Sequence, residues 1–62
     1  MTNAIDHLTT AQGWLARASR TNDRRFARYA MIDAQSARAR ATSAAQRAQA
    51  ASIIRTAEEI LS

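Results

Sequence analysis

The chain has 62 residues and a formal net charge of +4 at pH 7, with nine arginines and no lysine. It contains no cysteine and a single histidine, which excludes disulfide bonds within it and leaves no Cys/His cluster for a metal ion. A chain of this length buries only about 60% of the surface that its unfolded form exposes. We therefore expect one small domain over residues 1–62 that gains stability through association or very good helix packing.

The composition predicts an all-α protein. Alanine occurs 16 times, proline is absent and glycine occurs once, while Arg, Gln and Glu supply most of the remaining helix-forming residues. No apolar run approaches the roughly 20 residues of a membrane-spanning helix. The opening segment MTNAIDHL has neither the basic nor the apolar region of a signal peptide, so we expect a cytoplasmic protein.

A first helix is predicted over about residues 4–19. Asn3 is a typical N-cap residue, and Asp6 places a carboxylate near the positive end of the helix. Apolar residues then recur at steps of four and three, which gives the helix one packing side: Ala4, Leu8, Ala11, Leu15 and Ala18. The polar residues 19–22 predict a turn, with Asn22 as the cap of the next helix.

The remainder of the chain admits two interpretations. One is a single long helix over about residues 23–61, which would form a helical hairpin with the first. The other is a break near residues 42–43, where Ser43 and Gln46 have the spacing of a capping box, and this break would give a three-helix bundle. We favour the continuous helix, because a turn without Gly, Pro, Asn or Asp is unusual.

A seam of alanines predicts where this long helix packs. Eight alanines recur at alternating steps of three and four residues, and two larger residues continue the pattern. The predicted interface consists of Ala27, Ala30, Ala34, Ala37, Ala41, Ala44, Ala48, Ala51, Ile54 and Leu61. Because alanine lets helix backbones approach closely, we expect an alanine-rich coiled coil that forms a homo-oligomer, most simply a dimer, or binds another protein.

The arginines suggest an alternative function. A net charge of +4 attracts phosphate, so a small arginine-dependent nucleic-acid-binding protein is the second hypothesis. The residues that would make such contacts are Arg24, Arg25, Arg28, Arg40 and Arg47. They do not fall on one dense basic stripe of a helical wheel, which favours a solvated surface over a binding face.

No pattern of catalytic, metal-binding or cofactor-binding residues is found in the sequence. His7 is the only side chain that ordinarily titrates near neutral pH, and the adjacent Asp6 points elsewhere on a helix. Trp14 and Tyr29 are more typical of core or interface anchors than of ligand-stacking residues. We therefore expect a protein that is not an enzyme and uses no cofactor.

Two stretches, AIDHLTTAQGWLARA and RYAMIDAQSARARATSAAQ, carry a resemblance to a family. The chain resembles short alanine-rich helical proteins of actinobacteria and their phages, which are mostly of unknown function. In that family a leading H-L-x-x-A-x-x-L-A-x-A segment precedes a longer helix with an A-Q pair, here Ala34 and Gln35. Ser36, Arg38 and Arg40 stand where relatives commonly have a histidine and leucines. The resemblance implies an accessory or adaptor protein of such an organism and assigns no activity.

Overall fold

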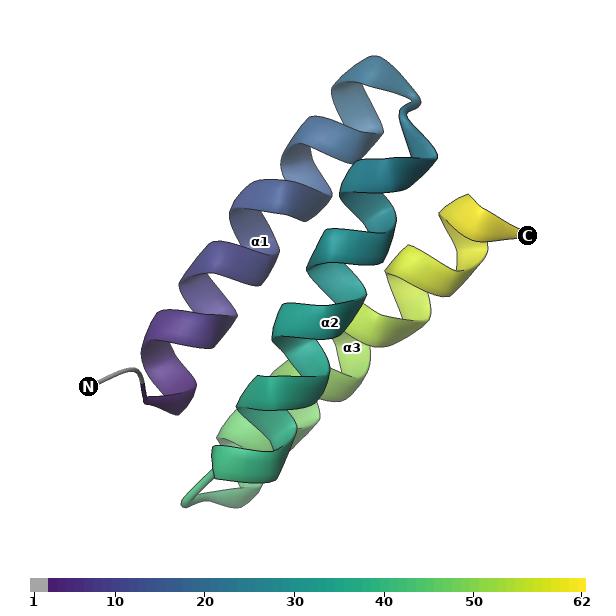
Figure 1. Cartoon of the computed structure of the whole chain (residues 1–62). Helices are drawn as coiled ribbons and strands as arrows, with labels where there is room; N and C mark the ends of the chain where they lie inside the picture. Colours follow the sequence, from purple (N-terminus) through teal and green to yellow (C-terminus); the bar gives the residue numbers. More distant parts are fainter. Residues whose placement is uncertain (1–2) are drawn as a thin grey trace.

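The computed structural model describes residues 3–62, which form three helices and no strand (Figure 1). The helices are α1 (Ala4–Thr21), α2 (Arg24–Arg40) and α3 (Ala44–Leu61). α1 and α2 form an antiparallel hairpin, and α3 folds back across α2 (Figure 1). α2 packs extensively against both neighbours, whereas α1 and α3 touch over a smaller area. The predicted all-α fold is confirmed.

Local caps set the limits of α1. The Asn3 side chain accepts a hydrogen bond from the backbone N–H of Asp6 at 2.9 Å, as predicted for the N-cap. At the other end Asn22 adopts the left-handed conformation, with φ 58°, and its N–H donates to the carbonyl of Ala18. Asn22 therefore ends α1 and does not cap the next helix. Asp23 is the N-cap of α2 and accepts a hydrogen bond from the N–H of Arg25.

The left-handed conformation of Asn22 leads to a prediction about this turn. Asn22→Ala is expected to destabilise the domain by about 1 kcal/mol, because a Cβ disfavours positive φ and asparagine tolerates it better than alanine does. Asn22→Gly is the matched control and should be neutral or stabilising, since glycine adopts this conformation without steric cost. The free energies of unfolding of both variants are measured by urea unfolding, monitored by circular dichroism. Equal stabilities for the two variants would contradict the prediction.

The continuous helix over residues 23–61 is wrong, and the break near residues 42–43 is confirmed. Ala41 is extended (φ −65°, ψ 136°), and the hydroxyl of Ser43 accepts a hydrogen bond from the N–H of Gln46 at 3.2 Å. The Gln46 side chain reaches back and accepts a hydrogen bond from the N–H of Thr42 at 2.8 Å. This reciprocal capping replaces the turn residues that the segment lacks.

Burial supplies the tertiary reason for the break. Folding α3 back onto the hairpin covers Ala50 and Ala57 completely and leaves Ile53 only 5% exposed. A helix that continued past residue 41 would carry this face away from α1 and leave it in water. The free energy gained by removing apolar surface from water favours the return.

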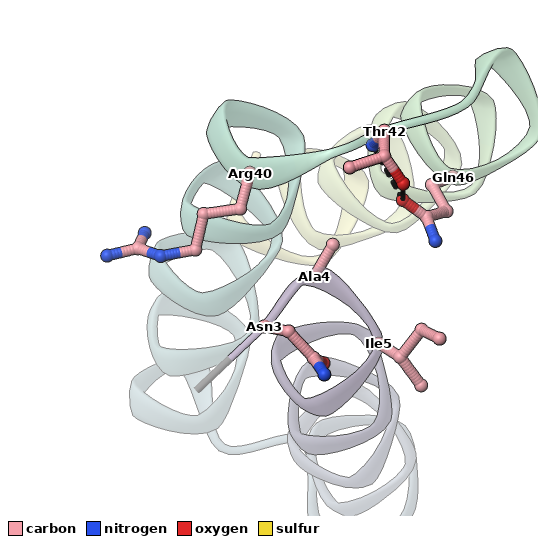
Figure 2. Close-up of a pocket in the computed structure, with 6 residues that line it drawn as sticks. All are labelled: Asn3, Ala4, Ile5, Arg40, Thr42 and Gln46. Atoms are coloured by element: carbon pink, nitrogen blue, oxygen red, sulfur yellow. Dashed lines mark hydrogen bonds between the residues drawn. The ribbon is translucent and has the colours of Figure 1, made fainter. Parts of the chain in front are cut away.

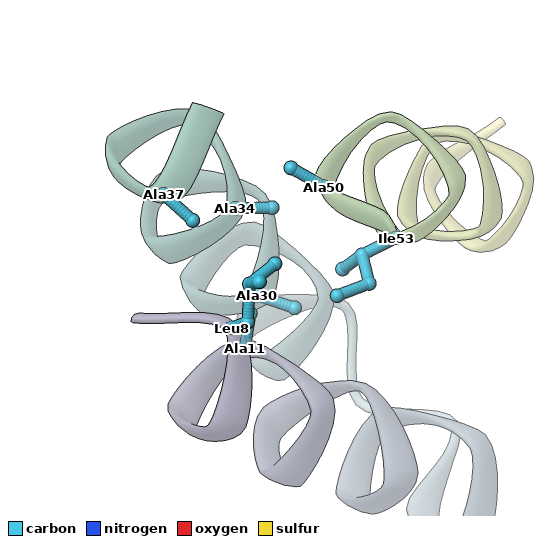
Figure 3. Packing of buried hydrophobic residues seen from close by; sticks show 7 residues of the cluster. All are labelled: Leu8, Ala11, Ala30, Ala34, Ala37, Ala50 and Ile53. Atoms are coloured by element: carbon cyan, nitrogen blue, oxygen red, sulfur yellow. The ribbon is translucent and has the colours of Figure 1, made fainter. Parts of the chain in front are cut away.

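The core is built mostly from small side chains. Figure 3 shows seven of its residues at the junction of the three helices, and all are at most 5% exposed: Leu8, Ala11, Ala30, Ala34, Ala37, Ala50 and Ile53. Alanine on α2 lets the flanking helices approach closely, while Leu8 and Ile53 supply most of the apolar volume. Within residues 3–62, no helix combines the length and the apolar character needed to cross a bilayer.

Candidate functional site

Half of the predicted alanine interface lies inside the chain. Ala27, Ala30, Ala34 and Ala37 have no exposed surface, because α1 and α3 of the same chain cover this side of α2. The four alanines of the seam on α2 therefore form a packing face, and the helices that pack on it belong to the same chain. A second chain could reach these four residues only if the bundle opened.

None of the other residues of the predicted interface is fully buried. Ala41 is half-buried in the turn, Ala44 and Ala48 are exposed, and Ala51 is half-buried. The break at residues 41–43 changes the helical phase, so Ala50 and Ile53 face the core one position before the seam predicts. Ile54 and Leu61 are half-buried, and Ile54 packs beside the core cluster.

Three aromatic side chains join α1 to α2 at the edge of this core, and one of them, Trp14, packs against it. The Trp14 ring stacks on Phe26 with centroids 5.5 Å apart and meets Tyr29 edge-on at 5.1 Å. The guanidinium carbon of Arg17 lies 5.6 Å from the centre of the Trp14 ring, which is within the range of a cation–π contact. Tyr29 is 44% exposed, so the cluster is open to solvent on one side.

Two shallow hollows flank the Trp14 ring, each with a volume of about 270 Å³. One lies on α1 and the other lies between α1 and α2. We call this region the Trp14 face, and it comprises Thr10, Gly13, Trp14, Arg17, Tyr29, Ile32 and Asp33. Ile32 is 60% exposed on this face, and Ile5, near the start of α1, is the other large aliphatic residue of the described chain that is mostly exposed, at 59%.

The Trp14 face is turned away from α3. The Ala34 side chain is directed toward Ala50 of α3 (Figure 3). Tyr29 precedes Ala34 by five residues, which places the two side chains about 140° apart around α2. The two helices of the hairpin therefore use one side for α3 and leave the aromatic side uncovered.

A histidine and an aspartate meet at the edge of this face. His7 Nδ1 lies 3.9 Å from Asp33 Oδ1, which is too long for a hydrogen bond. His7 Nε2 is buried and has no hydrogen-bond partner among residues 3–62. In the described part of the chain no group of three or more His, Cys, Asp or Glu side chains could hold a metal ion.

A third hollow, of about 150 Å³, lies where the start of α1 meets the α2–α3 turn (Figure 2). The amide oxygen of Gln46 is engaged there by the backbone and hydroxyl of Thr42. The Arg40 side chain extends away from the other lining residues (Figure 2), and its guanidinium lies 3.5 Å from the carbonyl oxygen of Ser36. The polar groups of this hollow do not converge on a common point, so we do not treat it as a binding site.

The five arginines proposed to contact nucleic acid are all exposed, but they are dispersed. Arg24 donates a hydrogen bond to the carbonyl of Leu61, and Arg25 forms an ion pair with Asp23 at 2.9 Å. Hydrogen bonding to Arg25 holds the pKa of Asp23 below its ordinary value of 3.8. Arg40 lies 16 residues after Arg24, about 24 Å along α2, and Arg47 is on α3. The structure thus does not gather the five into one patch.

From the sequence, Trp14 and Tyr29 were expected to be core or interface anchors, whereas the exposure of Ile32 and the hollow at Gly13 were not predicted. A signal for Ile32 was present, because it follows the buried Ala30 by two residues and so lies on the opposite side of the helix. Gly13 offered no such signal, since an isolated glycine in a helix has several explanations.

No protein-family model, curated protein or solved structure matches this chain. We therefore infer its function from the exposed side chains and the hollows between them.

Proposed function

We propose that this protein is a noncatalytic helical interaction module that self-associates, most simply as a dimer. The Trp14 face is the observation that carries the proposal. It presents the exposed Tyr29 and Ile32 beside the half-buried Trp14, around two open hollows on the side of the hairpin that α3 does not cover. Exposed apolar patches mark interaction sites, and Trp and Tyr are the types that most often anchor interfaces.

The thin core supports association as well. Leu8 and Ile53 are the only large side chains at 5% exposure or less among residues 3–62, and the other nine buried apolar residues are alanines. A domain of this size has little stability to spare. Binding between native copies stabilises the folded state by mass action, so the melting temperature should depend on concentration.

Light scattering over a concentration range of about 1–100 µM tests the proposal, because interfaces of ordinary size assemble with dissociation constants in or below that range. We expect twice the monomer mass and a melting temperature that rises with concentration. Association through apolar contacts should change little between low and high salt. A monomer mass at every concentration in this range, with a constant melting temperature, would contradict the proposal.

Arginine-dependent binding of nucleic acid is the second candidate. The observation in its favour is that all nine arginines are exposed, so each guanidinium can reach a phosphate. Phosphate contacts release counterions, and binding then falls steeply as the salt concentration rises. Fluorescence anisotropy of a labelled duplex at two salt concentrations distinguishes this function from self-association. Tight, salt-sensitive binding by a monomeric chain would favour it.

We also propose that the protein is a cytoplasmic accessory or adaptor protein of an actinobacterium or its phage. The support is the resemblance carried by the segments around His7 and Ala34 and by the bias toward arginine and alanine. A pull-down from such a host, with identification of the retained proteins by mass spectrometry, tests whether a second protein also binds.

A further inference from the structure

We propose that two copies of the chain dock through their Trp14 faces, with Ile32 of each copy seated in the hollow beside Gly13 of the other. This inference rests on the proposed self-association and names the surface that performs it. It places the interface on α1 and α2 and not on the outward alanines of α3.

One of the two hollows lies over Gly13 on the surface of α1. A Cβ at Gly13 would meet no atom within 4 Å, so the space above it is open. Thr10, Trp14 and Arg17 border this space, which has a volume of about 270 Å³. We call this shallow depression beside the Trp14 ring the notch, and an aliphatic side chain from a second copy can lie in it.

The same face carries a side chain that can fill such a notch. Ile32 is 60% exposed and lines the second hollow, on the other side of Trp14. Ile32 is the projection, and the hollow beside Gly13 is the notch. When both lie on one face, a twofold rotation can place the projection of each copy over the notch of the other. The two contacts form together and are identical by symmetry.

Charge favours a second copy as the occupant. The chain carries a net charge of +4, so most approaches of two copies bring arginines together. The Trp14 face differs because its two hollows are bordered by opposite charges, Arg17 at one and Asp33 at the other. The twofold rotation that pairs Ile32 with Gly13 turns the Arg17 side of one copy toward the Asp33 side of the other.

A dimer interface of standard size is larger than the seven residues of the Trp14 face. A standard interface buries about 800 Å² on each partner, and the chain exposes 4058 Å² in total. The Trp14 face would therefore be the centre of the interface, with other exposed residues of α1 and α2 around it.

Gly13→Leu tests the notch directly. The added side chain occupies the space that Ile32 would enter, so we expect the dimer dissociation constant to rise at least about tenfold. The fold should be retained, because position 13 is exposed and leucine favours a helix more than glycine does. Ile32→Ala removes the projection and should raise the constant by a similar factor. Ala48→Leu adds the same side chain to an exposed position on α3 and is the matched control.

Mixing the two variants gives the sharpest readout. In a heterodimer of Gly13→Leu with Ile32→Ala, one contact is native and the other sets the new leucine against the new alanine. Native mass spectrometry should therefore show the heterodimer at concentrations where each variant alone is monomeric.

If the wild type dimerises and Gly13→Leu dimerises equally well, the notch is not part of the interface, but the proposed self-association is still supported. If Ala48→Leu alone weakens the dimer, the interface lies on α3. A monomeric wild type, or one that binds only nucleic acid, overturns both proposals.

Discussion

Replacing Ile53 by alanine is expected to unfold most of the protein at room temperature. Ile53 is 5% exposed at the junction of the three helices and is the largest residue that α3 contributes to the core cluster. Isoleucine-to-alanine changes at buried sites destabilise by about 2–5 kcal/mol. A core this small rarely supplies more than about 3–5 kcal/mol in total, so the loss is comparable with the whole free energy of unfolding.

Urea unfolding followed by helical circular dichroism measures this effect. Ile32→Ala serves as the control, because the same side chain is removed from a position that is 60% exposed. Its loss from the monomer should cost less than about 0.5 kcal/mol. Both proteins are compared at a concentration where neither dimerises. Similar stabilities would mean that α3 does not pack as the structure has it.

Ala34→Leu is the second substitution with a large expected effect. Ala34 has no exposed surface and lies on α2 on the side that faces Ala50 of α3 (Figure 3). The larger side chain must push α3 away or adopt a strained rotamer, and such overpacking typically costs about 1–3 kcal/mol. The loss of helix packing should appear in the monomer, independently of protein concentration.

Ala48→Leu is the matched control for this substitution. Ala48 belongs to the same predicted seam, but the structure leaves it exposed. We expect the free energy of unfolding of this variant to stay within about 0.5 kcal/mol of the wild type. Comparable losses for the two variants, each dependent on protein concentration, would indicate that the whole seam packs between chains.

The turns show how far local signals reach. Asn3 caps α1 as the sequence predicted, through a hydrogen bond from the N–H of Asp6 three residues on, whereas α2 is capped by Asp23 and not by the predicted Asn22. Local sequence likewise marked the possible break through the spacing of Ser43 and Gln46. The sequence could not decide between that break and a continuous helix, because the deciding term is the burial of Ile53 against α1 and α2.

The predicted alanine interface, unlike the turns, could not be assigned to a partner from local sequence. Periodicity identifies the side of α2 that packs, yet Ala30 recurs with the same spacing whether its neighbour belongs to the same chain or to another. Ile32 is apolar in either environment, so its exposure depends on what covers α2. The open space at Gly13 depends equally on the absence of a neighbouring helix.

Sequence alone determined the helical fold class, the first turn and the inward side of α2, because propensity, capping and periodicity act over a few residues. Only the tertiary structure decided that α3 folds back, which of its sides faces inward and which apolar residues stay in contact with water. These depend on contacts such as that between Ala34 and Ala50, whose residues are distant in the sequence (Figure 3). A helical pattern specifies that a side must be covered, and the packing of the whole chain selects what covers it.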